Sequence, residues 1–497
     1  MKRVAFISLA LIGATTATAQ QSIKPRPLGV VQATSKELLG SATLARALPN
    51  GSVIVNDAAR RRLLLLDPSL QSYSVIADST SGSANGYGQR PGALIPYIAD
   101  STLFLDATAG SFLVIDPTGK VARVMSPPRP ADNFAMANTV AGFPGFDAGG
   151  RMVYRTNYPR VPQQLRDGSI QMSPAPDSAP LLRVDLDTRR ADTVGAVKTP
   201  RTLAAAITMP GGGTATMMRN APLATIDDWA ILSDGTIAIV RGRDYHIDWI
   251  FPDGTRRSTE KVAFEWKRLS DDDKLAIIDS IAKAPAGGPG GIPGGTQTIT
   301  FGGGDGMRMM MGGGGGGGGA VMATREFMVA GAAVAATPAT PPAAPAPTPT
   351  PQGKPAEAKS ADAKASATDS KNTTPATSAN NAATPAPATN AMPGGAPSGF
   401  TMPSMPAFSA SDLPDYMPPF TAASARADAD ANVWIRTTTP GLAAGGVVYD
   451  VINNKGQLVD RVDVPKGMSI VGFGRGGVVY LIEREGYGVR FLRATVR

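Results

Sequence analysis

The sequence predicts an all-β fold, a six-bladed β-propeller built from four-stranded antiparallel blades. The first observation is the stretch Asp228–Gly254, where three short strands follow one another, Trp229–Leu232, Thr236–Arg241 and His246–Phe251. Turns rich in Gly and Asp separate them, and β-branched residues fill the strands. The second observation is that this order of strands and turns occurs six times along the 497 residues. One such unit cannot bury both of its faces, whereas blades packed around a ring can.

Each copy has the order strand, tight turn, strand, variable loop, strand and polar turn, and a fourth strand follows most copies. The six copies are residues Ala47–Pro68, Tyr97–Gly119, Gly145–Asp187, Asp228–Gly254, Ala425–Gly456 and Ile470–Thr495. The fourth strands are Tyr73–Ile76, Val121–Met125, Arg190–Val194, Thr255–Val262 and Leu458–Val464.

The sixth copy has no fourth strand of its own, because the chain ends at Arg497. A further predicted strand, Leu28–Ala33, lies near the N-terminus and belongs to none of the six copies. We therefore expect this strand to complete the last blade, so that both chain ends are held in one sheet and the ring is closed.

The first 19 residues have the pattern of a secretory signal peptide. Lys2 and Arg3 are followed by the apolar run Val4–Ala14, and Ala17–Ala19 supplies small residues for cleavage before Gln20. The apolar run is shorter than the roughly 20 residues that span a bilayer. The chain has no cysteine, which excludes disulfides and thiolate metal sites. We expect a bacterial periplasmic or secreted protein without a stable membrane span.

The net charge of +8 is modest for this length, and the basic residues are scattered. Only short clusters occur, such as Arg60–Arg62 and Arg256-Arg257. A nucleic-acid-binding domain concentrates its positive charge on one face. The sequence therefore predicts no nucleic-acid partner.

The propeller sequence is interrupted after the fourth copy. Ser270–Lys283 predicts a short amphipathic helix packed on the propeller, with Ser270 and Asp273 as its capping pair. From 284 to 404 the chain is rich in Gly, Pro, Ala, Thr and Ser, a composition typical of disorder. The predicted organisation is a signal peptide (1–19), the first part of the propeller (20–283), a disordered insertion (284–404) and the second part of the propeller (405–497).

These patterns resemble a known family. The segment Asp234–Gly242 with Tyr245 and Trp249, the helix Asp271–Ile281 and the stretch Leu413–Trp434 are similar to six-bladed β-propellers of the NHL and TolB-like type. They are most similar to uncharacterised secreted bacterial members. The resemblance implies the fold but no particular activity, since propellers carry many unrelated functions.

Propeller ligands usually lie at the axis, on the face that bears the loops between second and third strands. In this chain those loops place acidic and basic residues at one face. The guanidinium group of an arginine binds a carboxylate or a phosphate through two parallel hydrogen bonds. The candidate ligand-binding ring consists of Asp57, Asp106, Arg155, Arg241, Arg243, Arg436 and Glu483. The alternative is that these are solvated loop residues that pair with one another.

The competing function is a metal-dependent hydrolase of the lactonase-like type. Asp57, Asp106 and Glu483 would then supply oxygen ligands to a divalent ion such as Ca²⁺, with Asn56 or Asn157 nearby. Arg155, Arg241 and Arg436 would crowd that cation. The leading hypothesis therefore needs no cofactor and no catalytic residue: an exported binding or scaffold module that takes an unknown protein or a small anionic ligand.

Catalysis by a histidine has little support in the residues present. His246 is the only histidine, and it opens a predicted strand in the fourth copy. No G-x-S-x-G motif accompanies it. We interpret His246 as a packed or loop residue.

Overall fold

The computed structural model describes residues 23–80, 86–88, 92–106, 109–156, 162–164, 170–172, 176–208, 214–283, 297–301, 308–311, 322–324, 407–442 and 446–496. The chain divides into two compact units, Met1–Glu326 with Pro403–Arg497, and Phe327–Met402. The second unit, the predicted signal peptide and most of the predicted insertion lie outside the described residues. All described residues belong to the first unit.

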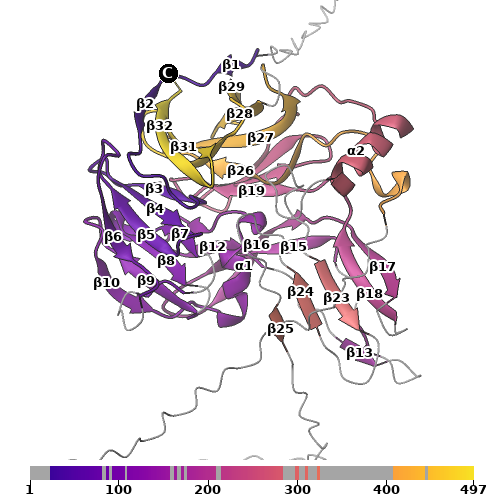
Figure 1. Cartoon of the computed structure of the whole chain (residues 1–497), viewed down its shortest axis with the longest axis horizontal. Coiled ribbons are helices and arrows are strands. Elements are labelled where there is room, and N and C mark those ends of the chain that lie inside the picture. Colours follow the sequence, from indigo (N-terminus) through magenta and orange to yellow (C-terminus); the bar gives the residue numbers. More distant parts are fainter. Residues whose placement is uncertain are drawn as a thin grey trace, which may run out of the picture. The chain divides into compact units, whose positions relative to one another are not determined.

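Six four-stranded antiparallel sheets form the six blades of a propeller ring, as the sequence predicts (Figure 1). Blade one contains β3 (Ala45–Ala47), β4 (Val53–Asp57), β5 (Arg62–Leu66) and β6 (Tyr73–Ala77). Blade two contains β7 (Ala93–Pro96), β8 (Thr102–Asp106), β9 (Ser111–Ile115) and β10 (Val121–Met125). Blade three contains β11 (Gly145–Phe146), β12 (Met152–Arg155), β15 (Ser178–Val184) and β16 (Ala191–Lys198). Blade four contains β19 (Asp228–Ile231), β20 (Ile237–Arg241), β21 (His246–Ile250) and β22 (Arg256–Ser258). Blade five contains β26 (Phe420–Ala427), β27 (Asn432–Pro440), β28 (Val447–Asn453) and β29 (Leu458–Val464). Blade six contains β30 (Met468–Phe473), β31 (Val478–Glu485), β32 (Gly488–Thr495) and β2 (Val31–Thr34).

The turns inside the blades follow from their residues. In blade four the backbone N–H of Thr236 donates to Asp234 Oδ1 at 2.9 Å, and Gly235 has φ +84°. A Cβ atom on Gly235 would lie 2.2 Å from the backbone nitrogen of Ala148 in blade three. Glycine is required there both by the left-handed conformation and by the close approach of the neighbouring blade.

The hydrophobic core is divided into six clusters, each between two successive blades. Tyr245 and Trp249 of blade four, for example, pack with Phe420 and Val433 of blade five. Trp249 is 1% exposed, and burying a large apolar side chain contributes roughly 1.5–3 kcal/mol. One cluster joins Val55 and Leu64 of blade one to residues of blade six, which closes the ring.

The predicted closing strand is confirmed. β2 pairs with β32 in antiparallel register, Val31 opposite Ala494 and Thr34 opposite Leu492. Before it, β1 (Arg26–Pro27) adds to the outer edge of blade five, parallel to β29. The N-terminal segment therefore covers the outer edges of two neighbouring blades and protects them from pairing with other chains.

Several strands that the sequence patterns did not predict lie outside the blades. β13 (Pro162–Gln164) and β14 (Ile170–Met172) form a hairpin in the long loop of blade three. β17 (Thr202–Thr208) and β18 (Thr214–Asn220) join β23 (Gln297–Phe301), β24 (Arg308–Met311) and β25 (Met322–Thr324) in one five-stranded sheet. The last three strands come from the stretch predicted as an insertion.

The predicted helix is α2 (Asp271–Lys283). Its cap is the expected one, because Ser270 N–H donates to Asp273 Oδ2 and Asp273 N–H donates to Ser270 Oγ, both at 3.1 Å. Its packing differs from the expectation: Lys274 is buried and bonds Asp415 at 2.9 Å, whereas Leu275 is 58% exposed. The helix contacts the short helix η4 (Ala410–Asp412). No described helix is both long and apolar enough to cross a membrane.

The connection between blades two and three crosses the ring. We call Pro130–Phe143 the central segment; it contains η2 (Pro130–Asp132), α1 (Asn133–Ala137) and η3 (Thr139–Ala141). α1 contacts β8 and β12, and η3 contacts the inner strand β26 of blade five. Because inner strands surround the axis of a propeller, the central segment lies across the middle of the ring. A further 3-10 helix, η1 (Ile98–Asp100), lies in blade two.

Candidate functional site

Of the seven residues predicted as a ligand-binding ring, five lie at the ends of second strands or in the turn after one, and two lie within second strands. Asp57, Asp106, Arg155 and Arg241 end β4, β8, β12 and β20, Arg436 and Glu483 lie in β27 and β31, and Arg243 follows β20. Second and third strands of every blade are joined at the same face of a propeller, which we call the loop face. Their individual surroundings, however, separate them into three groups.

Asp57 and Asp106 belong to the first group, carboxylates with structural partners. Asp57 is fully buried, and it accepts hydrogen bonds from the Ser41 backbone N–H at 2.9 Å and from Arg62 Nη2 at 3.1 Å. Asp106 accepts a hydrogen bond from the Ala109 backbone N–H at 3.1 Å. The Asp106 bond is local and holds the turn after β8. The Asp57 bonds join the end of β4 to the link before β3 and to the start of β5. Both residues therefore have a structural role.

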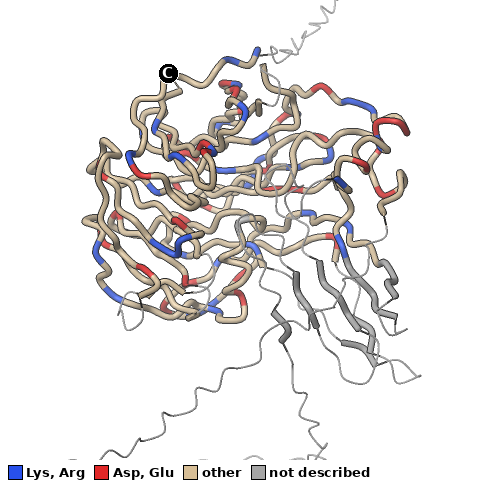
Figure 2. The backbone as a smooth tube through the Cα atoms, in the orientation of Figure 1, with Lys and Arg blue, Asp and Glu red and all other residues tan. Residues whose placement is uncertain are grey.

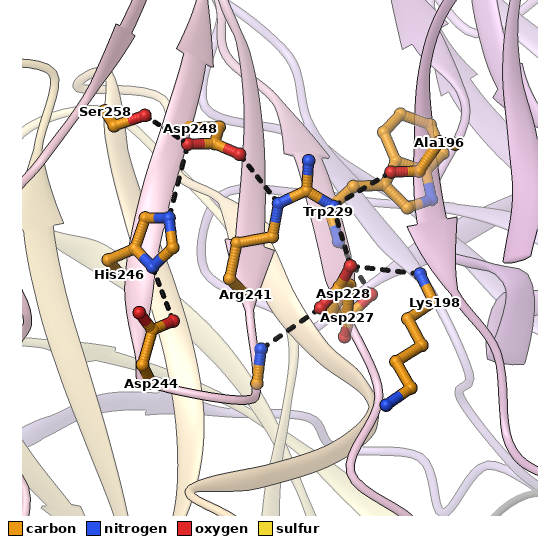
Figure 3. Close-up of polar contacts among 11 residues, drawn as sticks. Ala196, Lys198, Asp227, Asp228, Trp229, Arg241, Asp244, His246, Asp248 and Ser258 are labelled. Carbon is orange, nitrogen blue, oxygen red and sulfur yellow. Dashed lines mark hydrogen bonds and ion pairs between the residues drawn. The ribbon is translucent and has the colours of Figure 1, made fainter.

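Arg241 also belongs to the structural residues, because it is the centre of a charged network on blade four (Figure 3). Its Nε donates to Asp248 Oδ2 at 2.7 Å, and its Nη1 donates to Asp227 Oδ2 at 2.7 Å and to the Ala196 carbonyl at 3.0 Å. Burial acts to lower the pKa of Arg241, but Asp248 and Asp227 raise it overall. Since Ala196 lies in β16, this side chain ties blade four to the outer strand of blade three.

His246 lies in the same network, between two carboxylates (Figure 3). Its Nδ1 is 2.7 Å from Asp244 Oδ1, and its Nε2 is 3.3 Å from Asp248 Oδ1. Ser258 Oγ donates to Asp248 Oδ1 at 2.5 Å. The serine bonds a carboxylate and not the imidazole, so these side chains do not have the relay geometry of a Ser-His-Asp triad.

Exposed side chains form the second group. Arg243, Arg436 and Glu483 are exposed, and so is Arg484, the last-but-one residue of β31. Within the described part of the chain, none of the three guanidinium groups has a carboxylate partner. Arg243, Arg436 and Arg484 come from three consecutive blades, four, five and six. The loop face therefore presents three unpaired guanidinium groups over blades four, five and six, with the exposed carboxylate of Glu483 directly before Arg484 in the chain.

Arg155 forms the third group, together with a residue that sequence reasoning missed. Asp228 opens β19 and is 4% exposed; its carboxylate accepts hydrogen bonds from the backbone N–H groups of Ser424 and Ala425 at 2.7 and 3.0 Å. Burial raises the pKa of Asp228 to about 6, although these N–H groups and the charge of Arg155 act to lower it. Burial also lowers the pKa of Arg155, and Arg155 Nε has no partner among the described residues.

The central segment is the second feature that sequence reasoning missed. Trp229 Nε1 donates to the Ala141 carbonyl at 2.8 Å, and the guanidinium of Arg426 lies 4.4 Å from the centre of the Phe143 ring. Asp132 accepts hydrogen bonds from Tyr154 and Thr156 at 2.8 and 2.7 Å, which fixes the start of the segment. The signal in the sequence was the length of the link between blades two and three, since long connections in compact folds often have a role of their own.

Among the described residues, the acids considered for a divalent metal are not gathered into one group. Asp57 is bonded to Arg62, and Glu483 is exposed in β31. The described residues contain no group of three His, Asp or Glu side chains close enough to hold a metal ion. Asn157, a further candidate, lies outside the described residues.

Fold and site together define the class of protein, a six-bladed β-propeller with charged side chains on its loop face. No family model matches the chain, and no curated protein matches it. Solved structures that it resembles include an inactive virginiamycin B lyase from Staphylococcus aureus with quinupristin (10% identity, 96% of this chain and 100% of that chain covered, TM-score 0.30). Others are a gluconolactonase from Xanthomonas campestris (10%, 94% and 99%, 0.23) and a member of the duf4221 family from Bacteroides vulgatus (9%, 93% and 96%, 0.34). Similarity at this level carries no activity or ligand over to this chain.

Proposed function

We propose that this protein is an exported binding module of the NHL or TolB-like type, which takes carboxylate groups on its loop face. The ligand is a small anion or an acidic segment of a protein partner. Its positively charged contacts are Arg243, Arg436 and Arg484.

One observation carries the proposal: three exposed arginines of the loop face have no carboxylate partner among the described residues, against a single exposed acid of the predicted ring, Glu483. Asp57 is neutralised by Arg62, whereas Arg243, Arg436 and Arg484 stay exposed without a carboxylate partner in the described part of the chain. Figure 2 shows that positive and negative residues are interspersed elsewhere along the described backbone. Free guanidinium groups bind carboxylates through forked, charge-assisted hydrogen bonds.

Exposed side chains at the hairpin ends of blades five and six support a partner on the loop face. The hairpin β31–β32 ends at Tyr487, which is 108% exposed, and the hairpin β27–β28 leads to Leu442, which is 60% exposed. Tyr and Arg are the residue types that most often dominate the energy of protein interfaces. Apolar side chains at hairpin ends beside free arginines suit an acidic peptide with apolar residues.

Calorimetric titration tests the proposal with two probes, citrate and a hexaglutamate peptide. The variant R243Q/R436Q/R484Q is compared with R123Q/R190Q/R475Q, which removes the same charge from exposed positions outside the loop face. The titrations are done at low salt, because exposed charge pairs are screened at high salt.

We expect the loop-face variant to lose at least tenfold in affinity and the control variant to bind like the wild type. Binding of both probes supports a small-anion site, and binding of the peptide alone supports an acidic partner. Equal losses in the two variants would mean that only net charge matters, and the proposal would be wrong.

A further inference from the structure

A pocket at the junction of blades six and one has no role in the function proposed above. Its volume is about 480 Å³, within the usual range for small-molecule sites. One wall is the link that follows the closing strand β2, and the other is the turn between β5 and β6. Its lining includes Lys36, Glu37, Leu39, Leu66, Leu70 and Tyr73.

The floor of this pocket is apolar. Leu39, Leu66 and Leu70 are 1%, 3% and 2% exposed. Leu70 has φ +63°, a left-handed conformation that costs a non-glycine residue roughly 1–2 kcal/mol. Its backbone is held there by two hydrogen bonds, from its own N–H to the Asp67 carbonyl at 3.0 Å and from the Lys36 N–H to its carbonyl at 3.2 Å.

The rim of the pocket has two charged residues, of which Glu37 is paired with arginines and Lys36 has no partner among the described residues. The Glu37 carboxylate is bonded by Arg62 at 3.2 Å and by Arg60 at 3.3 Å. Burial acts to raise the pKa of Glu37, but hydrogen bonds from Tyr73 and Arg62 lower it overall, so this group stays ionised and committed to its arginines. Lys36 is exposed, and its ammonium group has no partner within the part of the chain that the structure describes.

We infer that this pocket binds a small amphipathic carboxylate, with its apolar body on Leu39, Leu66 and Leu70 and its carboxylate on Lys36. Lining and charge both favour this class of ligand: the floor is apolar, and among the described lining residues the one charge without a partner is positive. Because the pocket joins the link after β2 to blade one, a bound ligand also stabilises the closure of the ring.

Calorimetry and thermal shift with octanoate test the inference, with acetate and octanol as probes that lack the apolar body or the charge. Octanoate should bind saturably and raise the melting temperature, and acetate and octanol should bind at least tenfold more weakly. Lys36→Gln should reduce octanoate affinity about tenfold, whereas Lys120→Gln, at an exposed lysine of blade two that does not line the pocket, should leave it unchanged.

The charge-reversed variant Lys36→Glu separates the proposed site from nonspecific effects. It should lose octanoate binding and gain binding of octylammonium. Equal binding of octanol and octanoate, or octanoate affinity that is independent of residue 36, would overturn the inference. These results are distinct from those on the loop face, because Arg243, Arg436 and Arg484 are unchanged in every protein used here.

Discussion

The guanidinium of Arg426 lies 4.4 Å from the centre of the Phe143 ring, so the inner strand of blade five touches the link between blades two and three. Arg426 also donates to the carbonyls of Ile470 and Val471 in blade six at 2.6 and 2.9 Å. Burial lowers the pKa of Arg426 to about 10, which still leaves it charged at neutral pH. This side chain therefore joins blades five and six to the central segment.

Removing the aromatic ring should loosen this junction. Phe143→Ala should lower the free energy of unfolding by about 2 kcal/mol, because it deletes a cation–π contact and a packed ring. Phe134→Ala is the matched control, since Phe134 lies in the same segment but is 53% exposed, and it should change stability by less than about 0.5 kcal/mol. Urea unfolding measures both. Equal effects would show that the central segment is not held through Phe143.

Asp228 should make stability depend on pH in an unusual direction. Its pKa rises from 3.8 in the unfolded chain to about 6 in the folded protein, so the folded state binds the extra proton between these values. Its contribution to stability is therefore greatest near pH 4 and is lost as the pH rises through about 6, by about 3 kcal/mol in total.

Asp228→Asn isolates this contribution from that of other carboxylates. The stability difference between wild type and variant, measured by urea unfolding from pH 4 to pH 8, should shift against the wild type as the pH rises towards 7. The variant keeps one acceptor oxygen for the Ser424 and Ala425 N–H groups, but its NH2 group replaces the oxygen that accepts from the Trp229 N–H, which adds a cost of its own. A difference that stays flat across this range would contradict the raised pKa.

Arg241 and Arg243 are two residues apart, yet they should respond differently to substitution. Arg241→Ala leaves the partly buried carboxylates of Asp227 and Asp248 without their cation and should cost about 2–4 kcal/mol in urea unfolding. Arg243→Ala removes an exposed side chain and should cost less than about 0.5 kcal/mol. Similar costs for the two variants would show that the network in Figure 3 does not support blade four.

The closing strand should be essential for a stable ring. A chain that begins at Ser35 lacks β1 and β2 and leaves the edges of β29 and β32 open. We expect its melting temperature to fall by roughly 10 °C, for a loss of a few kcal/mol. A chain that begins at Gln20 keeps both strands and should melt like the full chain. If both chains melted alike, closure through β2 would not contribute to stability.

The sequence could predict the blades because their patterns are local. Strand alternation, Asp-Gly turns such as Asp234-Gly235 and the sixfold recurrence depend on neighbouring residues, and all six blades were found from them. The capping pair Ser270 and Asp273 is equally local and was also correct. The strands β17, β18 and β23 were missed: β17 and β18 are neighbours in the chain but do not belong to the blade pattern, and β23 pairs with β18 across a long stretch of chain.

The candidate site was predictable only in part. The sequence by itself determined which residues reach the loop face, because the position of a residue at the end of a second strand follows from the blade pattern. Only the tertiary structure decided their roles: it paired Arg241 with Asp227 and Asp248, left Arg243 free, and buried Asp228 against the backbone of Ser424 in the next blade. The physical reason is that the pairing and pKa of a charged side chain depend on which groups the other blades bring within a few ångströms, and the local pattern of one blade does not contain that information.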